Sequence, residues 1–173
     1  MTYGSFTIDA AAQLNNQASM MNRNINIKGE DPNAIPDYQA STPETFQEQL
    51  YELTAAYLQL KDALVETDAN TASDAAKNVI QSLEKVNKTL LQGDVQLYWV
   101  EQLTALQTHS QKITTATTIE TQRQQFEFVS IAMIRTITAF GTSEETLYIQ
   151  HCPMAFEYQG ADWLAAEEGI RNP

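Results

Sequence analysis

The sequence predicts a mainly α-helical protein, an antiparallel up-down four-helix bundle followed by a short β-like C-terminal tail. Glycine and proline are scarce, with 6 and 5 among 173 residues, and this composition favours helix. Apolar residues recur at steps of three and four through four segments of about 20 residues each, so each segment has one apolar stripe. After residue 141 the pattern changes to an alternation typical of strands.

The N-terminal 40 residues lie outside the predicted bundle. Tyr3 to Asp9 alternates apolar and polar residues, which predicts a strand, and Asp9 is a candidate cap for a short helix ending near Met21. The next stretch carries two prolines and no apolar period, as in a linker. The predicted organisation is therefore residues 1–22 strand and helix, 23–40 linker, 41–141 bundle and 142–173 tail.

The four predicted bundle helices follow from their start signals and stripes. Ser41 and Glu44 fit a capping box, or Thr42 caps with Pro43 in the first helical position. Gly93 is predicted to be left-handed at a helix end, with the following residue, Asp94, capping the next helix. The stripes are Phe46, Leu50, Leu53, Tyr57, Leu60 and Leu64; then Ala72, Ala76, Val79, Leu83, Val86 and Leu90; then Trp99, Leu103, Leu106, Ser110 and Ile113; then Ile119, Phe126, Val129, Met133, Ile137 and Phe140.

The tail is predicted to contain two short strands. Residues 146–152 alternate β-branched and aromatic side chains, and Phe156 to Tyr158 resembles a returning strand. Gln159-Gly160 has turn composition. Trp163-Leu164 together with Ile170 suggests a short helical cap over the end of the bundle.

The charge is strongly acidic. Ten lysines and arginines stand against 22 aspartates and glutamates, which gives a formal charge of −12. Such a surface repels phosphate backbones and anionic lipids, and it attracts cations. Nucleic acid is therefore not expected as a partner. No stretch approaches the length of a membrane span, and no secretory signal pattern opens the chain.

His151-Cys152-Pro153-Met154 places an imidazole, a thiol and a thioether within four residues. Thiolate and thioether are soft ligands that favour Cu(I) or Ag(I) over Mg²⁺ or Ca²⁺. Pro153 biases Cys152 towards an extended backbone, which would turn the two sulfurs to a common point. The alternative is that Cys152 and Met154 are ordinary buried residues and His151 lies at the surface.

Other chemistry has weaker support. The chain carries no phosphate loop, nucleophile elbow or Glu-x-x-His pair, so we do not expect an enzyme. A thiol enzyme stays open as a rival, although His151 is badly placed on a strand to activate Cys152. Structural zinc lacks its four Cys or His ligands. His109 is expected to face solvent, Met20-Met21 to pack, and the Glu144-Glu145 and Glu167-Glu168 pairs to be solvated.

The tail resembles a known helical domain of unknown function. The residues that carry the resemblance are Tyr148 to Phe156, Gly160 to Leu164, and Ile170 to Pro173, together with the Gln122-Arg123-x-x-Phe126 pattern and Ser130. Such domains occur alone in exported bacterial proteins, and they also occur at the C-terminus of periplasmic adaptors, or membrane fusion proteins, of copper/silver RND efflux pumps. Residues 3–14, continuing to Met21, also resemble the segment by which the adaptor chain leaves its membrane-proximal domain.

The resemblance implies a periplasmic domain that binds Cu(I) or Ag(I) and hands it to the export pathway. It implies Cys152 and Met154 as ligands with His151 as a third candidate, and no cofactor needed for folding. Pump components or periplasmic metal carriers would be the partners, and self-association is open. Family members continue past the Asn-Pro into a Met and a Cys-Gly, so the resemblance also implies that this chain holds an incomplete site. The rival is a structural interaction module with buried Cys and Met and no metal.

Overall fold

The computed structural model describes residues 34–143 and 146–173. The chain divides into two compact units at Ile35 and Pro36, and the second unit, Pro36–Pro173, is described below. The predicted N-terminal strand and helix, most of the predicted linker, Met20-Met21 and Glu144-Glu145 lie outside the described residues.

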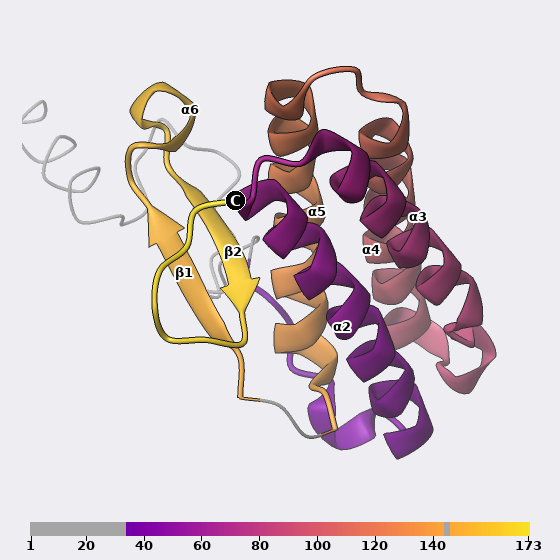
Figure 1. The fold of residues 1–173 in the computed structure, drawn as a ribbon. Helices are drawn as coiled ribbons and strands as arrows, with labels where there is room; N and C mark the ends of the chain where they lie inside the picture. Colours follow the sequence, from indigo (N-terminus) through magenta and orange to yellow (C-terminus); the bar gives the residue numbers. More distant parts are fainter. Residues whose placement is uncertain (1–33, 144–145) are drawn as a thin grey trace, which may run out of the picture. The chain divides into compact units, whose positions relative to one another are not determined.

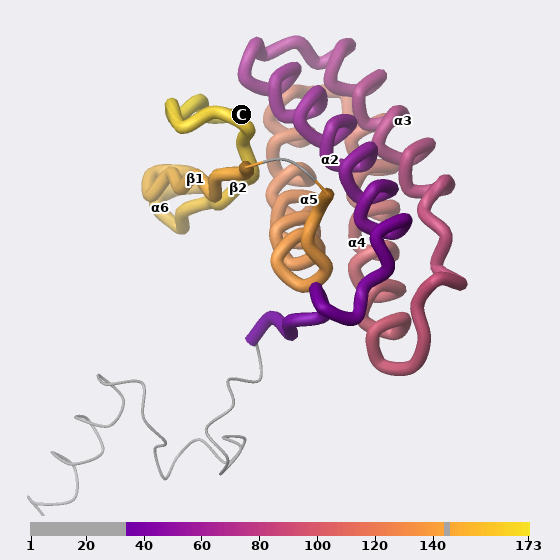
Figure 2. Tube along the Cα trace, turned by 90° about the horizontal axis from the view of Figure 1, so that it is seen from below, coloured from indigo at the N-terminus to yellow at the C-terminus, as the bar shows by residue number. Residues whose placement is uncertain are grey.

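Four long helices pack against one another, which confirms the predicted fold class (Figures 1 and 2). They are α2 (Glu44–Val65), α3 (Ala69–Lys85), α4 (Gly93–Thr115) and α5 (Ile119–Phe140). Each helix packs on its neighbour in the chain, and α5 closes the bundle against α2. Two short 3-10 turns, η1 (Gln39–Ser41) and η2 (Lys88–Leu90), lie before α2 and between α3 and α4. No helix among the described residues is long and apolar enough to cross a membrane.

The predicted stripes form the core of the bundle. All six residues of the first stripe are buried, and Met133 is buried as expected. Aromatic rings fill one end, where Phe46 and Trp99 meet edge to face with ring centres 5.4 Å apart and Phe140 lies 5.4 Å from Phe46. The remaining stripe positions are buried or half-buried, Leu90, Leu103, Ile119 and Ile137 being half-buried.

The start of α2 differs from the prediction. The helix begins at Glu44 after Pro43, and neither predicted cap forms. The hydroxyls of Ser41 and Thr42 instead donate to the Tyr38 carbonyl at 2.9 and 2.8 Å. The prediction failed because both hydroxyls bond the carbonyl of Tyr38, the residue before η1, instead of the N–H groups of the coming helix.

The connection between α3 and α4 is also different in detail. Gly93 has the predicted left-handed backbone, with φ of 59°. Gln92 rather than Asp94 occupies the cap position, and Asp94 lies in the first turn, where its carboxylate still faces the positive end of the helix. The α3 helix ends at Lys85, so the last residues of its predicted stripe belong to the connection.

Asp68 is a cap that the sequence analysis missed. Its carboxylate accepts hydrogen bonds from the backbone N–H groups of Asn70 and Thr71, both at 3.0 Å. These bonds, together with the Thr71 hydroxyl, lower the pKa of Asp68. A carboxyl with a lowered folded-state pKa stabilises the fold above its unfolded pKa, and this stabilisation disappears as the pH falls through the folded value.

We therefore expect Asp68→Ala to lower the melting temperature at neutral pH, because two N–H groups at the start of α3 lose their acceptor. The difference from wild type should shrink when both proteins are melted near pH 3. Thermal melts across pH, with Asp74→Ala as an exposed control on the same helix, would measure it. An equal deficit at both pH values would contradict the capping role of the charged carboxylate.

The tail forms a two-stranded antiparallel sheet that packs on α5 through its second strand. The strands are β1 (Tyr148–Cys152) and β2 (Ala161–Ala165). The first strand was predicted. The second was not, because Phe156 to Tyr158 lies in the turn α6 (Ala155–Tyr158), and Trp163-Leu164 belongs to β2 rather than to a helical cap. The predicted turn at Gln159-Gly160 is present, and Gly160 has a φ of 81°.

Candidate functional site

A pocket of about 540 Å³ lies between α5 and the β1–β2 hairpin. One wall comes from a single face of α5, where positions spaced by three and four residues point towards the hairpin. The opposite wall comes from the end of β1, the α6 turn, the start of β2 and the end of the chain. The lining residues are Arg123, Phe126, Glu127, Ser130, Cys152, Met154, Ala155, Phe156, Ala161, Asp162, Trp163, Asn172 and Pro173.

Cys152 and Met154 both line this pocket. Cys152 is the last residue of β1 and is half-buried, and Met154 is 66% exposed at the entrance to the α6 turn. Cys152 is also the one cysteine of the chain and carries a free thiol. The two sulfur-bearing residues are therefore on one side of the hairpin, and solvent reaches at least the thioether.

His151 does not line the pocket. Neighbouring residues on a strand point to opposite faces, so the imidazole is directed away from Cys152. Its Nδ1 lies 2.8 Å from Oδ1 of Asp162, its partner in the strand register. The third predicted ligand is thus engaged in a cross-strand polar pair at the surface.

The turn between the strands has an unusual backbone. Phe156, Glu157 and Tyr158 have φ values of 48°, 57° and 69°, so three successive residues other than glycine are left-handed. Each such residue costs about 1–2 kcal/mol relative to the right-handed form. Pairing of β1 with β2 closes this turn and fixes the position of Met154, the residue just before it.

The α5 wall brings two oppositely charged side chains to the pocket. Arg123 Nη2 donates to the Leu64 carbonyl at the end of α2 and to the Thr67 hydroxyl, at 2.9 and 3.0 Å. Burial raises the pKa of the Glu127 carboxyl. Arg123 had been noted only as part of a resemblance, and Phe126 also as a residue of the fourth apolar stripe, whereas the spacing 123, 126, 127, 130 would have placed one α5 face opposite the tail.

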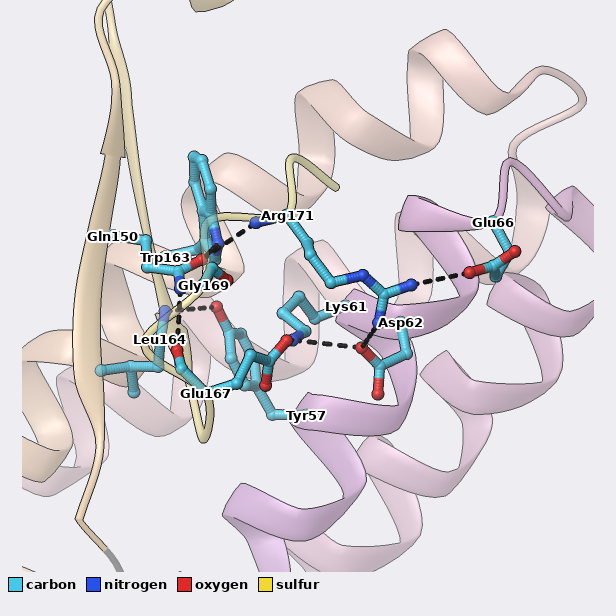
Figure 3. A network of polar contacts seen from close by, with 10 residues as sticks. All are labelled: Tyr57, Lys61, Asp62, Glu66, Gln150, Trp163, Leu164, Glu167, Gly169 and Arg171. Atoms are coloured by element: carbon cyan, nitrogen blue, oxygen red, sulfur yellow. Dashed lines mark hydrogen bonds and ion pairs between the residues drawn. The ribbon is translucent and has the colours of Figure 1, made fainter.

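A buried hydrogen-bond network docks the hairpin on the bundle (Figure 3). Tyr57 Oη accepts from the Leu164 backbone N–H at 3.1 Å and lies 2.7 Å from Ser130 Oγ. Burial raises the pKa of the Tyr57 phenol, so it stays neutral and keeps its proton for hydrogen bonding. This pair of contacts joins β2 to both α2 and α5 beside the pocket.

Gln150 and an ionic cluster hold the end of the chain (Figure 3). Gln150 accepts from the Trp163 indole N–H and donates to the carbonyls of Glu167 and Gly169, each at 2.9 Å. Lys61, which is 1% exposed, contacts the Glu167 carboxylate at 2.6 Å. The expectation that the Glu167-Glu168 pair is merely solvated is therefore wrong for Glu167.

Two further points concern metal ligands. Within residues 34–143 and 146–173, no group of three or more His, Cys, Asp and Glu side chains is placed to hold a metal ion. His109 is half-buried rather than solvent-facing, because its ring stacks on Phe128 and its Nδ1 lies 2.9 Å from Gln125 Oε1.

Comparison with known proteins places most of the bundle in one family. Residues 53–145 match the model of a family described as "Protein of unknown function (DUF3347)". The match runs from within α2 to just beyond α5, and the hairpin follows it. No curated protein and no solved structure matches the chain.

Proposed function

The chain belongs to the DUF3347 family of proteins of unknown function. We propose that it is a soft-metal-binding domain of a periplasmic heavy-metal efflux adaptor. The ion would be Cu(I) or Ag(I), carried as cargo and handed to the export pathway. Pump components or periplasmic metal carriers would be its partners. The family assignment supplies no function, so the proposal is argued from the residues of this chain.

The observation that carries the proposal is that Cys152 and Met154 line the same pocket. A thiolate and a thioether select soft monovalent ions over hard divalent ones. Phe126, Phe156 and Trp163 lower the polarity of the pocket around them, which favours a charge-neutralising thiolate–Cu(I) pair over a hydrated ion.

The exposure of Met154 supports exchange rather than storage. The exposed thioether of Met154 can be replaced by a ligand of a donor or acceptor protein, while the half-buried Cys152 keeps the ion. Transfer by ligand replacement makes and breaks only metal–ligand bonds. His151 is not needed in this scheme, because its imidazole points to the other face of the hairpin and contacts Asp162.

A Cu(I) titration of the reduced protein against a chromogenic chelator tests the proposal. We expect Cys152→Ser/Met154→Leu to lower the Cu(I) affinity by about 100-fold or more, beyond the 10–100-fold that loss of an outer-shell partner costs. The matched control is His151→Gln, which changes a nearby side chain outside the pocket and should leave the affinity within about threefold. Equal affinities for wild type and the double variant would remove the metal claim.

A structural interaction module is the second candidate, and exposed apolar residues favour it. Leu97 on α4 and Phe128 and Ile131 on α5 are 68%, 45% and 44% exposed. Large exposed apolar side chains are common at protein interfaces. This candidate predicts that the same Cu(I) titration finds no role for Cys152 and Met154.

A further inference from the structure

The last eight residues form a separate feature, which we call the strap (residues 166–173). After β2 the strap turns back along the hairpin (Figure 1), and its last two residues, Asn172 and Pro173, line the pocket together with Cys152. The strap therefore forms one side of the site that also contains the thiol.

Apolar burial does little to hold the strap in place. None of its residues is buried, and its one large apolar side chain, Ile170, is 66% exposed. Segments with little buried apolar surface open locally at a much lower free energy than the core of the domain. Whatever keeps the strap closed must come from its polar contacts.

Two ion-pair contacts latch the strap to α2 (Figure 3). Glu167 meets Lys61 at 2.6 Å, and the same ammonium lies 3.1 Å from Asp62. Four residues further on, Arg171 meets Glu66 at 2.7 Å and approaches Asp62 at 3.9 Å. The cation lies on α2 in the first ion pair, Lys61 with Glu167, and on the strap in the second, Arg171 with Glu66.

Hydrogen bonds of the Gln150 side chain complete the attachment of the strap to the rest of the domain. Its side chain binds the carbonyls of Glu167 and Gly169, and the Arg171 N–H approaches its Oε1 at 3.4 Å. Gln150 is fixed from the other side by Trp163, so it belongs to the hairpin and not to the strap. When the strap moves away from α2, water replaces the hydrogen bonds of Gln150. The ion pairs between α2 and the strap, by contrast, are broken.

We infer that the strap is a charge-latched wall of the pocket, and that release of its ion pairs with α2 opens access to Cys152 while the bundle stays folded. The ionic contacts are the natural point of control, because a charged or basic partner surface can compete for Asp62, Glu66 and Glu167. As a regulator of metal exchange this device rests on the proposed function, whereas the latch itself needs no metal.

Alkylation of Cys152 by an uncharged reagent such as N-ethylmaleimide measures the opening. The metal-free wild type is compared with Glu167→Gln/Arg171→Gln, and each rate is divided by that of the same protein in urea, which removes intrinsic thiol reactivity. We expect about 3- to 30-fold faster labelling in the variant, since it loses the exposed Arg171–Glu66 ion pair and the contact of Glu167 with the buried Lys61 ammonium. Labelling of the wild type should also accelerate with added salt, and the variant should lose most of this dependence.

The control is Lys77→Gln, which removes an exposed ion pair with Asp74 on α3, away from the strap. Its labelling rate should equal that of wild type. Urea unfolding of all three proteins shows whether the bundle is intact. Unchanged labelling in the double variant, or an increase that only follows a fall in the stability of the whole domain, would overturn the latch. If the double variant is labelled faster as expected but the protein binds no Cu(I), the latch is supported and the metal-binding proposal fails.

Discussion

Replacing Trp99 with alanine should lower the free energy of unfolding by about 3–5 kcal/mol. Trp99 is fully buried at the aromatic end of the bundle. Its ring meets Phe46 and Phe140 edge to face, with ring centres 5.4 and 6.2 Å apart. Alanine would leave a cavity among three helices that the facing rings cannot close, because each is already held by the others.

Urea unfolding followed by circular dichroism measures this loss. Leu97→Ala is the matched control on the same helix, since Leu97 is 68% exposed and should change stability by less than about 0.5 kcal/mol. Trp99→Phe refines the test. The indole N–H of Trp99 has no partner among the described residues, so phenylalanine loses area but removes an unsatisfied donor. A cost for Trp99→Ala as small as that for Leu97→Ala would mean that the ring is not core.

Replacing Gln150 with leucine should cost about 2–4 kcal/mol, although the volume is nearly kept. Gln150 is 4% exposed and is the acceptor for the Trp163 indole, which is itself buried. Leucine would leave that donor and the carbonyls of Glu167 and Gly169 without their partner. An unpaired buried polar group costs its full desolvation free energy, which exceeds what an apolar replacement recovers.

The position of this loss can be measured as well as its size. Hydrogen exchange should show faster opening of β1, β2 and the strap, with smaller changes in the four long helices. Gln124→Leu, an exposed position on α5, supplies the control and should be close to neutral. Wild-type exchange in the hairpin of the Gln150 variant would show that other contacts hold the tail.

The bundle was predictable because burial on a helix repeats with the helical period. Phe46 to Leu64 and Phe126 to Phe140 each mark one face, and no distant information is needed to assign them. The helix ends were less predictable. Thr42 had the right identity for a cap but bonds the Tyr38 carbonyl, while Asp68, which was not predicted as a cap, caps α3.

The tail was harder because short apolar runs fit more than one structure. Trp163-Leu164 suits a strand or a helix by composition, and its pairing with Ile149 and Gln150 decided the matter. The left-handed run at Phe156 could not be foreseen, because aromatic residues rarely adopt positive φ.

The sequence named Cys152 and Met154, which line the pocket, but it could not predict what surrounds them. Strand alternation from the run before Pro153 already separates His151 from Cys152, and the structure places them so. The partners of Gln150, Lys61 and Tyr57 are distant in sequence, Lys61 and Glu167 being 106 residues apart. A polar residue in a sequence shows its bonding capacity but not the group that will satisfy it.

The three left-handed residues between the strands strain the loop that begins just after Met154. At about 1–2 kcal/mol each, their conformations amount to several kcal/mol that the paired strands must restrain. If β1 and β2 separated at this end, the loop would relax to ordinary backbone angles, and the Met154 thioether would move with it. The positions of the Cys152 and Met154 sulfurs are therefore coupled to the pairing of β1 with β2. An ion bound by both sulfurs would in turn stabilise the paired hairpin.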